Sequence, residues 1–310
     1  MLIKIKQYLF LILILTVNVL ASNGGKNHSA EALNRGRYVP IATSDNFLVA
    51  AKTFSSLTSR KVDIYDLSNG ILYLEKISEI ISPDPSPGDD FGFSMALYNN
   101  YLLIGSPGHD NGNGRVYLYY KDQQEGWILI KTFNNPNKLN DPRQSQKFGY
   151  NVAINENYII IASPFYNDGT VFLYHFNPES ENFRNSNTDL FDMIDVRKLG
   201  DVEGCYSEGP DKFGFGVSMS FNNNKLLIGS LKDFVHLVEL REDTISRVDI
   251  TYPTEEDLTK DDNKRFGQSV YVGESDIYIS ALGNSDGRGK VFIYPYDNSN
   301  NRADNISLKK

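Results

Sequence analysis

Histidine, cysteine and clustered acidic residues most often perform catalysis or bind metals, and this 310-residue sequence holds few such groups. Its four histidines are His28, His109, His175 and His236, and none has the His-x-x-x-His spacing of a metal site. Cys205, the single cysteine, lies in an acidic segment without the positive neighbour that activates a thiolate. The sequence contains no Gly-x-Ser-x-Gly elbow, phosphate loop or dinucleotide fingerprint. These features predict a protein that is not an enzyme and that needs neither a metal nor a cofactor.

Polar residues gather instead in short loops that contain Asn-Gly or Asp-Gly. Such dipeptides are ordinary hairpin-turn sequences, but loops that share one face of a scaffold also form binding sites. The candidate surface includes the linkers Ile81–Asp90, Asn134–Lys147 and Pro253–Arg265. The candidate ligand-binding residues of the loops themselves are His109, Asp110, Asn111, Asn113, Asn167, Asp168, Asn284, Asp286 and Arg288.

The loops alternate with short segments rich in β-branched and aromatic residues, which predict β-strands. A Phe-Gly pair recurs at Phe91, Phe148, Phe213 and Phe266, and each unit of roughly 50 to 65 residues contains about four such segments. A period of this size is typical of a β-propeller blade. We therefore predict an all-β propeller of about five four-stranded blades. The repeats span residues 38–80, 91–133, 148–199, 213–251 and 266–310.

The first strands are predicted to begin at the Phe-Gly pairs, and the second strands, apolar on both faces, to lie between neighbouring blades. The phenylalanine suits packing between blades, and the glycine suits a tight turn or a close backbone approach. In the first unit the fourth strand is predicted at Ile71–Ile77, in the third within Leu190–Leu199, and in the fifth at Asn305–Lys309.

The phrases Phe91-Gly92-Phe93-Ser94 and Ile104-Gly105-Ser106-Pro107-Gly108, followed by Gly114-Arg115-Val116-Tyr117, resemble FG-GAP repeats. The approach Ser86–Gly92 also matches the lead-in of such repeats, and the resemblance covers about Tyr38 to Tyr296. FG-GAP repeats build the propeller of integrin α-subunits and of many surface proteins. The resemblance implies a binding or adhesion role.

The sequence departs from integrins in two ways. The loops after the first strands, such as Tyr98–Asn100 and Asn155–Asn157, are too short and too poor in carboxylates for calcium, so no metal is carried over. Integrins also have seven blades. Five blades would form either a small closed ring or an incomplete one, whose exposed sheet edges would favour self-association.

The N-terminus has the pattern of a secretory signal peptide: Lys4 and Lys6, an apolar run over Tyr8–Leu20, and Ala21. We expect a signal peptide at residues 1–21, a flexible leader at 22–37 and the propeller at 38–310, with a signal-anchor as the alternative. The run is shorter than the roughly 20 residues of a membrane span, and no other stretch predicts a transmembrane segment in the mature chain.

Two glycosylation sequons begin at Asn27 and Asn305, which agrees with export. The unpaired Cys205 is expected to be either buried or an intermolecular thiol. With 31 basic and 39 acidic side chains and no basic block, the chain is not expected to bind nucleic acid.

These observations predict a non-catalytic, secreted or cell-surface-associated glycoprotein that recognises an extracellular protein or matrix partner through loops on one propeller face. A lectin-like propeller that binds carbohydrate is the alternative. A hydrolase is the third possibility, because propellers also carry enzymes.

Overall fold

The computed structural model describes residues 40–52, 61–69, 74–136, 145–165, 169–178, 194–195, 218–222, 224–229, 234–241, 244–251, 266–273, 275–281 and 290–295. All of them belong to the compact unit Pro40–Lys310. The predicted signal peptide, leader, glycosylation sequons, Cys205 and the fourth strand at Asn305–Lys309 lie outside the described residues.

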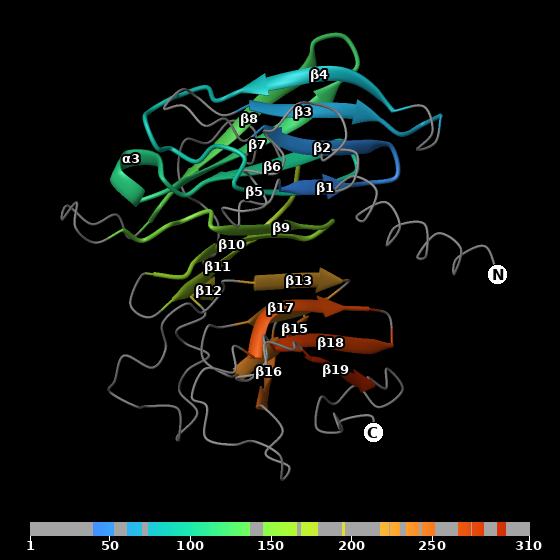
Figure 1. Cartoon of the computed structure of the whole chain (residues 1–310), viewed down its shortest axis with the longest axis vertical. Helices are drawn as coiled ribbons and strands as arrows, with labels where there is room; N and C mark the ends of the chain where they lie inside the picture. The colour runs from blue at the N-terminus through green and yellow to red at the C-terminus, as the bar shows by residue number, and fades with distance from the viewer. Residues whose placement is uncertain are drawn as a thin grey trace. The chain divides into compact units, whose positions relative to one another are not determined.

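The described chain consists of five antiparallel sheets (Figure 1), which we call blades 1 to 5. Blade 1 contains β1 (Ile41–Thr43), β2 (Phe47–Lys52), β3 (Lys61–Asp66) and β4 (Glu75–Ile81). Blade 2 contains β5 (Ser94–Tyr98), β6 (Tyr101–Ser106), β7 (Arg115–Asp122) and β8 (Gly126–Asn134), with the short helix α3 (His109–Gly112) between β6 and β7. Blade 3 contains β9 (Asn151–Ile154), β10 (Tyr158–Ser163), β11 (Thr170–His175) and β12 (Ile194–Asp195). Blade 4 contains β13 (Ser218–Asn222), β14 (Lys225–Gly229), β15 (Phe234–Arg241) and β16 (Thr244–Thr251), and blade 5 contains β17 (Phe266–Val272), β18 (Asp276–Ala281) and β19 (Lys290–Pro295).

The predicted all-β fold with repeated four-stranded units is confirmed, and each blade orders its strands as they follow in the chain. The second strands of blades 2, 3 and 4 are buried on both faces as predicted: all six residues of β10 are buried. Four apolar clusters hold consecutive blades together, and each joins residues of one blade to residues of the next. Leu103 and Leu118, for example, pack against Ile159 and Phe172 of blade 3.

The predicted starts of the first strands were wrong in blades 2 and 3, whereas β17 of blade 5 begins at Phe266 as predicted. We expected a strand from Phe91, but β5 begins at Ser94, because Gly92 has a φ of +82° and forms a turn instead. In this turn the backbone N–H of Phe93 donates to the carbonyl of Asp90 at 2.9 Å. Blade 3 repeats the turn at Phe148-Gly149, where Gly149 has a φ of +85°. Glycine is required here because side chains disfavour positive φ.

The Phe-Gly backbone also approaches the preceding blade closely, as predicted, because the second strand has a glycine at the contact. A Cβ built on Gly105 of β6 would lie 2.2 Å from the carbonyl oxygen of Gly149 in blade 3. A Cβ on Gly229 of β14 would lie 1.9 Å from that of Gly267 in blade 5. Serine hydroxyls complete these contacts, because Ser94 Oγ donates to Gly149 O at 2.8 Å and Ser218 Oγ donates to Gly267 O at 2.6 Å.

The strand pairing corrects the alignment of the fourth unit. Ser94 follows Gly92 by two positions and pairs with Gly105. Ser218 pairs with Gly229 in the same way, so the sequence equivalent of Phe91-Gly92 is Phe215-Gly216 and not Phe213-Gly214. The first unit also differs from expectation, because its fourth strand runs over Glu75–Ile81 and pairs Ile81 with Lys61.

Candidate functional site

Three connections, one within blade 2 and one joining blade 2 to each of its neighbours, meet at one end of the strands, and we call this surface the loop face. They are the β4–β5 connection, the β6–β7 connection with α3, and the β8–β9 connection. Backbone hydrogen bonds join all three: Gly108 N donates to Asp89 O at 3.0 Å, and Lys147 N donates to Gly112 O at 2.8 Å. The loop face therefore combines the linker Ile81–Asp90 and the described ends of the linker Asn134–Lys147 with the polar loop that contains His109, Asp110, Asn111 and Asn113.

The β6–β7 connection has an unusual backbone. Asp110 and Asn111 both have left-handed conformations, with φ of +50° and +58°. Asn and Asp tolerate this region better than other side chains, yet two in succession are uncommon. Asn111 is exposed at the tip of the turn, whereas His109 and Gly112 are buried beneath it. We had expected an ordinary hairpin turn, and the structure has a short helical turn that presents Asp110 and Asn111.

Neighbouring residues hold this turn from the blade 3 side. The carbonyl oxygen of Asn113 accepts hydrogen bonds from Phe148 N at 3.2 Å and from the buried Asn135 side chain at 3.1 Å. Asn135 also donates to the side chain of Gln146, which is buried. A Cβ built on Gly112 would lie 2.2 Å from Ser145 Oγ, so the turn is tightly packed against the β8–β9 connection.

An ion pair lies on the other side of the turn. Arg115 contacts Asp84 through Nη1, and its Nε donates to Asn134 Oδ1 at 2.9 Å. His109 Nε2 lies 3.5 Å from Asp84 Oδ2. Burial lowers the pKa of His109 and the Arg115 charge lowers it further, while the nearby carboxylates of Asp84, Asp110 and Asp89 act in the opposite direction.

A row of three half-buried aromatic residues lies beside these polar loops. Phe93 and Tyr150 occupy the position after the Phe-Gly glycine in blades 2 and 3, and their ring centroids are 4.7 Å apart. Phe165, just after β10, packs edge-on against Tyr150 at 5.6 Å. We call these residues the aromatic row. Aromatic rings next to polar groups are common at recognition surfaces.

The structure thus brings together four of the predicted ligand-binding residues: His109, Asp110, Asn111 and Asn113. The other five, Asn167, Asp168, Asn284, Asp286 and Arg288, lie outside the described residues. Sequence reasoning did not single out Asp84, Arg115 or the aromatic row. A signal was present for the aromatic row, because Phe93 and Tyr150 follow Phe-Gly at the same position in two units.

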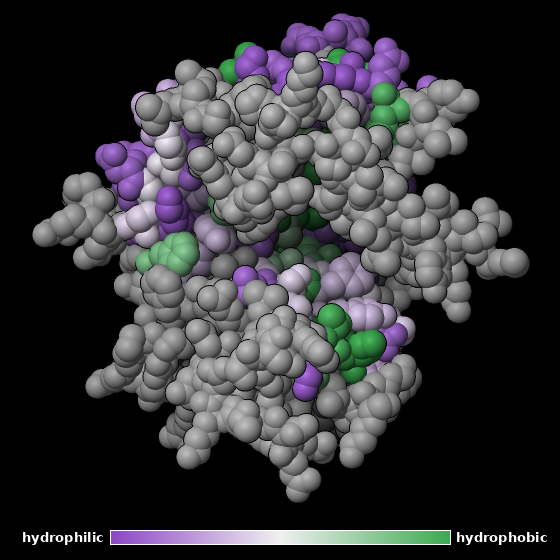
Figure 2. Space-filling model, in the orientation of Figure 1, coloured by the Kyte–Doolittle hydropathy of each residue, from purple (hydrophilic) through white to green (hydrophobic). Residues whose placement is uncertain are grey.

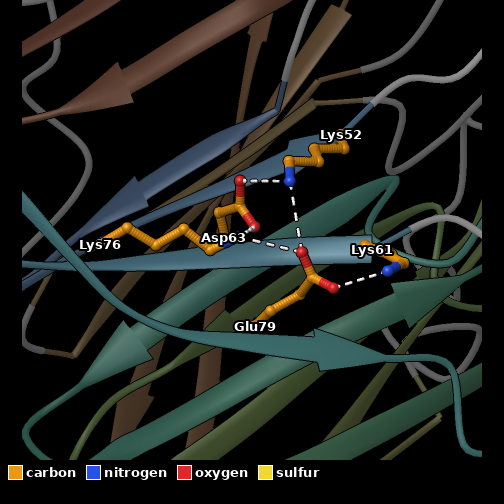
Figure 3. Close-up of polar contacts among 5 residues, drawn as sticks. All are labelled: Lys52, Lys61, Asp63, Lys76 and Glu79. Atoms are coloured by element: carbon orange, nitrogen blue, oxygen red, sulfur yellow. Dashed lines mark hydrogen bonds and ion pairs between the residues drawn. The ribbon is translucent and has the colours of Figure 1, made fainter.

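A second polar cluster lies on blade 1, in strands that precede α3 in the sequence. Asp63 of β3 is buried and ion-paired with Lys52 at 3.0 Å and Lys76 at 2.6 Å. Glu79 of β4 is ion-paired with Lys61 at 2.6 Å, Lys76 at 2.9 Å and Lys52 at 3.2 Å. Figure 3 shows that the five side chains come from β2, β3 and β4 and point toward one another.

This blade 1 cluster satisfies its own charges. The three lysines lower the pKa of the Glu79 carboxyl, with Lys61 the largest cause. Its carboxylates and ammonium groups are already paired, so the arrangement is best explained as a structural network. The loop face, whose exposed Asn111 lies at the tip of a hydrogen-bonded turn, is the stronger candidate for recognition.

Within the described ranges, no three His, Cys, Asp or Glu side chains are grouped so that they could hold a metal ion. Nor does any helix among the residues that the structure describes have the length and apolarity to cross a membrane.

Comparison with protein families gives one match, the FG-GAP repeat, over residues 75–119. These residues comprise β4 to most of β7 and therefore include the β4–β5 connection, α3 and Arg115. Comparison with curated proteins gives no match.

Comparison with solved structures supports the fold. The outer coat vertex of COPII on membranes matches with a TM-score of 0.53 and 13% identity, over 88% of this chain and 63% of that chain. A structure of the COPII coat assembled on membranes gives the same TM-score and identity, over 88% of this chain and 35% of that chain. The N-terminal domain of Nup159 matches with a TM-score of 0.45 and 11% identity, over 83% of this chain and 58% of that chain. At these identities the COPII likeness shows a β-propeller fold and nothing about activity.

Proposed function

We propose that this FG-GAP repeat protein of the β-propeller fold is a non-catalytic binding module that recognises an extracellular protein or matrix partner through its loop face. One observation carries the proposal: three connections around blade 2 hold a polar turn in a strained conformation that exposes Asn111. A turn that is ordered before binding loses little conformational entropy on association. Its side chains can therefore contribute to affinity and not only to folding.

The chemistry of the loop face agrees with recognition rather than catalysis. His109 is buried, and its nearest acidic group, Asp84, is paired with Arg115. Ser106 Oγ, the hydroxyl below the turn, donates to the carbonyl of Asp89 at 2.7 Å and is fully buried. A nucleophile needs an adjacent base and access to substrate, and this hydroxyl has neither. These observations support the proposal of a non-catalytic module.

The test is binding of the purified chain to immobilised matrix proteins and to cell surfaces, measured by surface plasmon resonance and flow cytometry. Replacing Asp110 and Asn111 together by glycine keeps the positive φ values and removes both side chains. We expect at least about a tenfold loss of affinity, the result of losing one or two polar contacts. Unchanged binding by this variant, or no binding by the wild-type chain, would contradict the proposal.

A matched control is available at the opposite end of β7. Gln124 and Glu125 are exposed in the β7–β8 turn, and only their backbone N–H groups bond to Asp122. The Gln124→Gly, Glu125→Gly variant removes an amide and a carboxylate, as the loop variant does. Its binding should equal that of the wild type.

A lectin-like role is the second candidate, and the aromatic row favours it. Sugar rings pack their apolar faces on aromatic side chains, and polar groups beside the rings bond the hydroxyls. Glycan-array binding that is lost in Tyr150→Leu but retained in the Asp110→Gly, Asn111→Gly variant would favour this role over protein recognition.

The proposed module acts outside the cell or at its surface. This part of the proposal rests on the sequence pattern of residues 1–21. It predicts that expressing cells release a product that begins near Ser22, which mass spectrometry of the culture medium would detect. A product retained inside the cells with Met1 intact would contradict it.

A further inference from the structure

The outward face of blade 5 is apolar and exposed. Tyr271 of β17, Tyr278 of β18, and Val291 and Ile293 of β19 have exposed fractions of 55%, 37%, 64% and 37%. Figure 2 shows a hydrophobic patch at the place that β18 and β19 occupy in Figure 1. We call these four residues the blade 5 patch.

The strand pairing identifies the surfaces of the other blades that are equivalent to this patch. Tyr271, Tyr278 and Ile293 form one row across blade 5, since Tyr271 pairs with Tyr278 and Tyr278 with Ile293. The equivalent rows of the preceding blades are Ala96–Leu103–Leu118, Ala153–Ile160–Leu173 and Ser220–Leu227–Leu237.

Those equivalent rows are the surfaces that pack against the next blade. Leu103 and Leu118 are fully buried against blade 3. Ile160 and Leu173 are buried against blade 4, and Leu227 and Leu237 against blade 5. In blade 1 the equivalent row, Ala42–Val49–Ile64, packs against blade 2 in the same way. The blade 5 patch therefore repeats an interface that the molecule uses four times, and we expect its partner to be another β-sheet face.

The outward face of blade 1 does not supply a matching surface. The row equivalent to Tyr117 and Phe172 has Asp63 in blade 1, paired with Glu79 on β4. Around these two carboxylates lie Lys52, Lys61 and Lys76 (Figure 3). Packing tyrosine and isoleucine against this network would remove five charged groups from water without an apolar gain, which is unfavourable.

We propose that the blade 5 patch is a dimer interface that binds the same patch on a second copy of this chain. A two-fold interface brings identical apolar surfaces together, so Tyr, Val and Ile of one copy cover those of the other. Face-to-face sheets pack about 10 Å apart with interdigitating side chains, as the blades do within one chain. The proposal does not depend on the loop face, which lies at strand ends and not on a sheet face.

The test is the mass of the purified chain in solution, measured by sedimentation velocity over a range of concentrations with reductant present. The reductant excludes a dimer linked through Cys205. We expect a reductant-insensitive dimer, and Ile293→Glu should raise its dissociation constant at least about 100-fold, because two carboxylates would be buried at the interface. Ile293 is partly exposed, so the variant should keep its circular dichroism spectrum and melting temperature.

Ile81→Glu is the matched control, because Ile81 is 51% exposed on the outward face of blade 1. The dimer should survive this change. A monomeric wild-type chain, or a dimer that survives Ile293→Glu with the native spectrum, would overturn the proposal. Loss of the dimer in Ile81→Glu would instead show that blade 5 packs on blade 1 of the second copy, and would equally overturn the proposed symmetric interface.

Discussion

At the scale of single residues, His109 is the group whose surroundings matter most for the loop face. Its side chain lies beneath the Asp110–Asn111 turn, next to the Asp84–Arg115 ion pair. Because burial and the Arg115 charge lower its pKa below the ordinary value of 6.5, the folded protein favours the neutral imidazole at neutral pH.

This pKa shift predicts a stability change with pH. As pH falls below about 6.5, the unfolded chain binds a proton at His109 more readily than the folded chain. The free energy of unfolding should therefore decrease as the pH is lowered from about 7.5 to about 5, and His109→Gln should lessen that decrease. Urea denaturation of both proteins at the two pH values measures the difference. Parallel losses in wild type and variant would show that the histidine does not contribute.

At the scale of elements, each connection and strand is held by a small set of repeated contacts. In blades 2 and 3 the serine at the end of the second strand donates a hydrogen bond to the connection that leads into its own blade. Ser106 Oγ donates to Asp89 O, and Ser163 Oγ donates to Gln146 O at 2.8 Å. Blade 1 lacks this serine and has Lys52 at the end of β2. There the charged network of β2, β3 and β4 covers the outward face, and Figure 2 shows hydrophilic side chains over β4.

The blade 1 network predicts a loss of stability in acid. Lysines hold the pKa of Glu79 below its ordinary value of 4.5. The stabilisation is therefore present above about pH 4.5 and is lost as pH falls toward the lower, folded pKa. Glu79→Gln should destabilise the protein at about pH 6 and lessen the further loss between about pH 5 and about pH 2.5.

Chemical denaturation of wild type and Glu79→Gln over this pH range would measure the effect. Because the group is partly exposed, about 1 M salt should reduce the difference between the two proteins. A salt-insensitive difference would mean that packing, and not charge, accounts for it.

At the scale of the whole molecule, the blades are joined in series by interfaces of one design. In blades 2 and 3 the glycine of the Phe-Gly turn approaches the second strand of the preceding blade, as Gly92 does over Ala51 and Gly149 over Gly105, and Gly267 of blade 5 approaches Gly229 of blade 4. In repeat proteins, stability is approximately a sum of unit and neighbour-interface contributions. Damage to one interface should therefore act mainly on the two blades that share it.

Gly105→Ala tests this expectation. The added Cβ would lie 2.2 Å from the carbonyl oxygen of Gly149, and such overpacking costs about 1–3 kcal/mol. Hydrogen exchange should accelerate in blades 2 and 3 more than in blade 5. Gly126→Ala is the control, because no atom lies within 4 Å of its added Cβ. It should cost only about 1 kcal/mol, through its positive φ, without loosening the interface. Uniform acceleration in all blades would argue against independent interfaces.

The sequence alone determined the strands, the repeat and the polar turn, because these depend on local composition and period. Alternating apolar residues at Leu103 or Val116 predict burial wherever the sheet lies. The Phe-Gly pairs predicted both a turn and a close approach, since glycine alone permits each. The errors were the hairpin turn expected at Asp110–Asn111, the start of β5, which lies after the Gly92 turn, and the fourth unit, where Phe213-Gly214 precedes the pair equivalent in register.

Only the tertiary structure decided which loops meet. Asp84 belongs to the β4–β5 connection and Arg115 to β7, and Phe93, Tyr150 and Phe165 come from two blades, so their contacts depend on strand register and blade packing. The pairing of Asp63 with Glu79 likewise depends on a bulge between Ile64 and Tyr65, which shifts the register of β3 and β4 by one residue and which the sequence does not predict. Contacts between distant residues require the fold to be complete, because a shift of one residue in register moves each side chain to the opposite face.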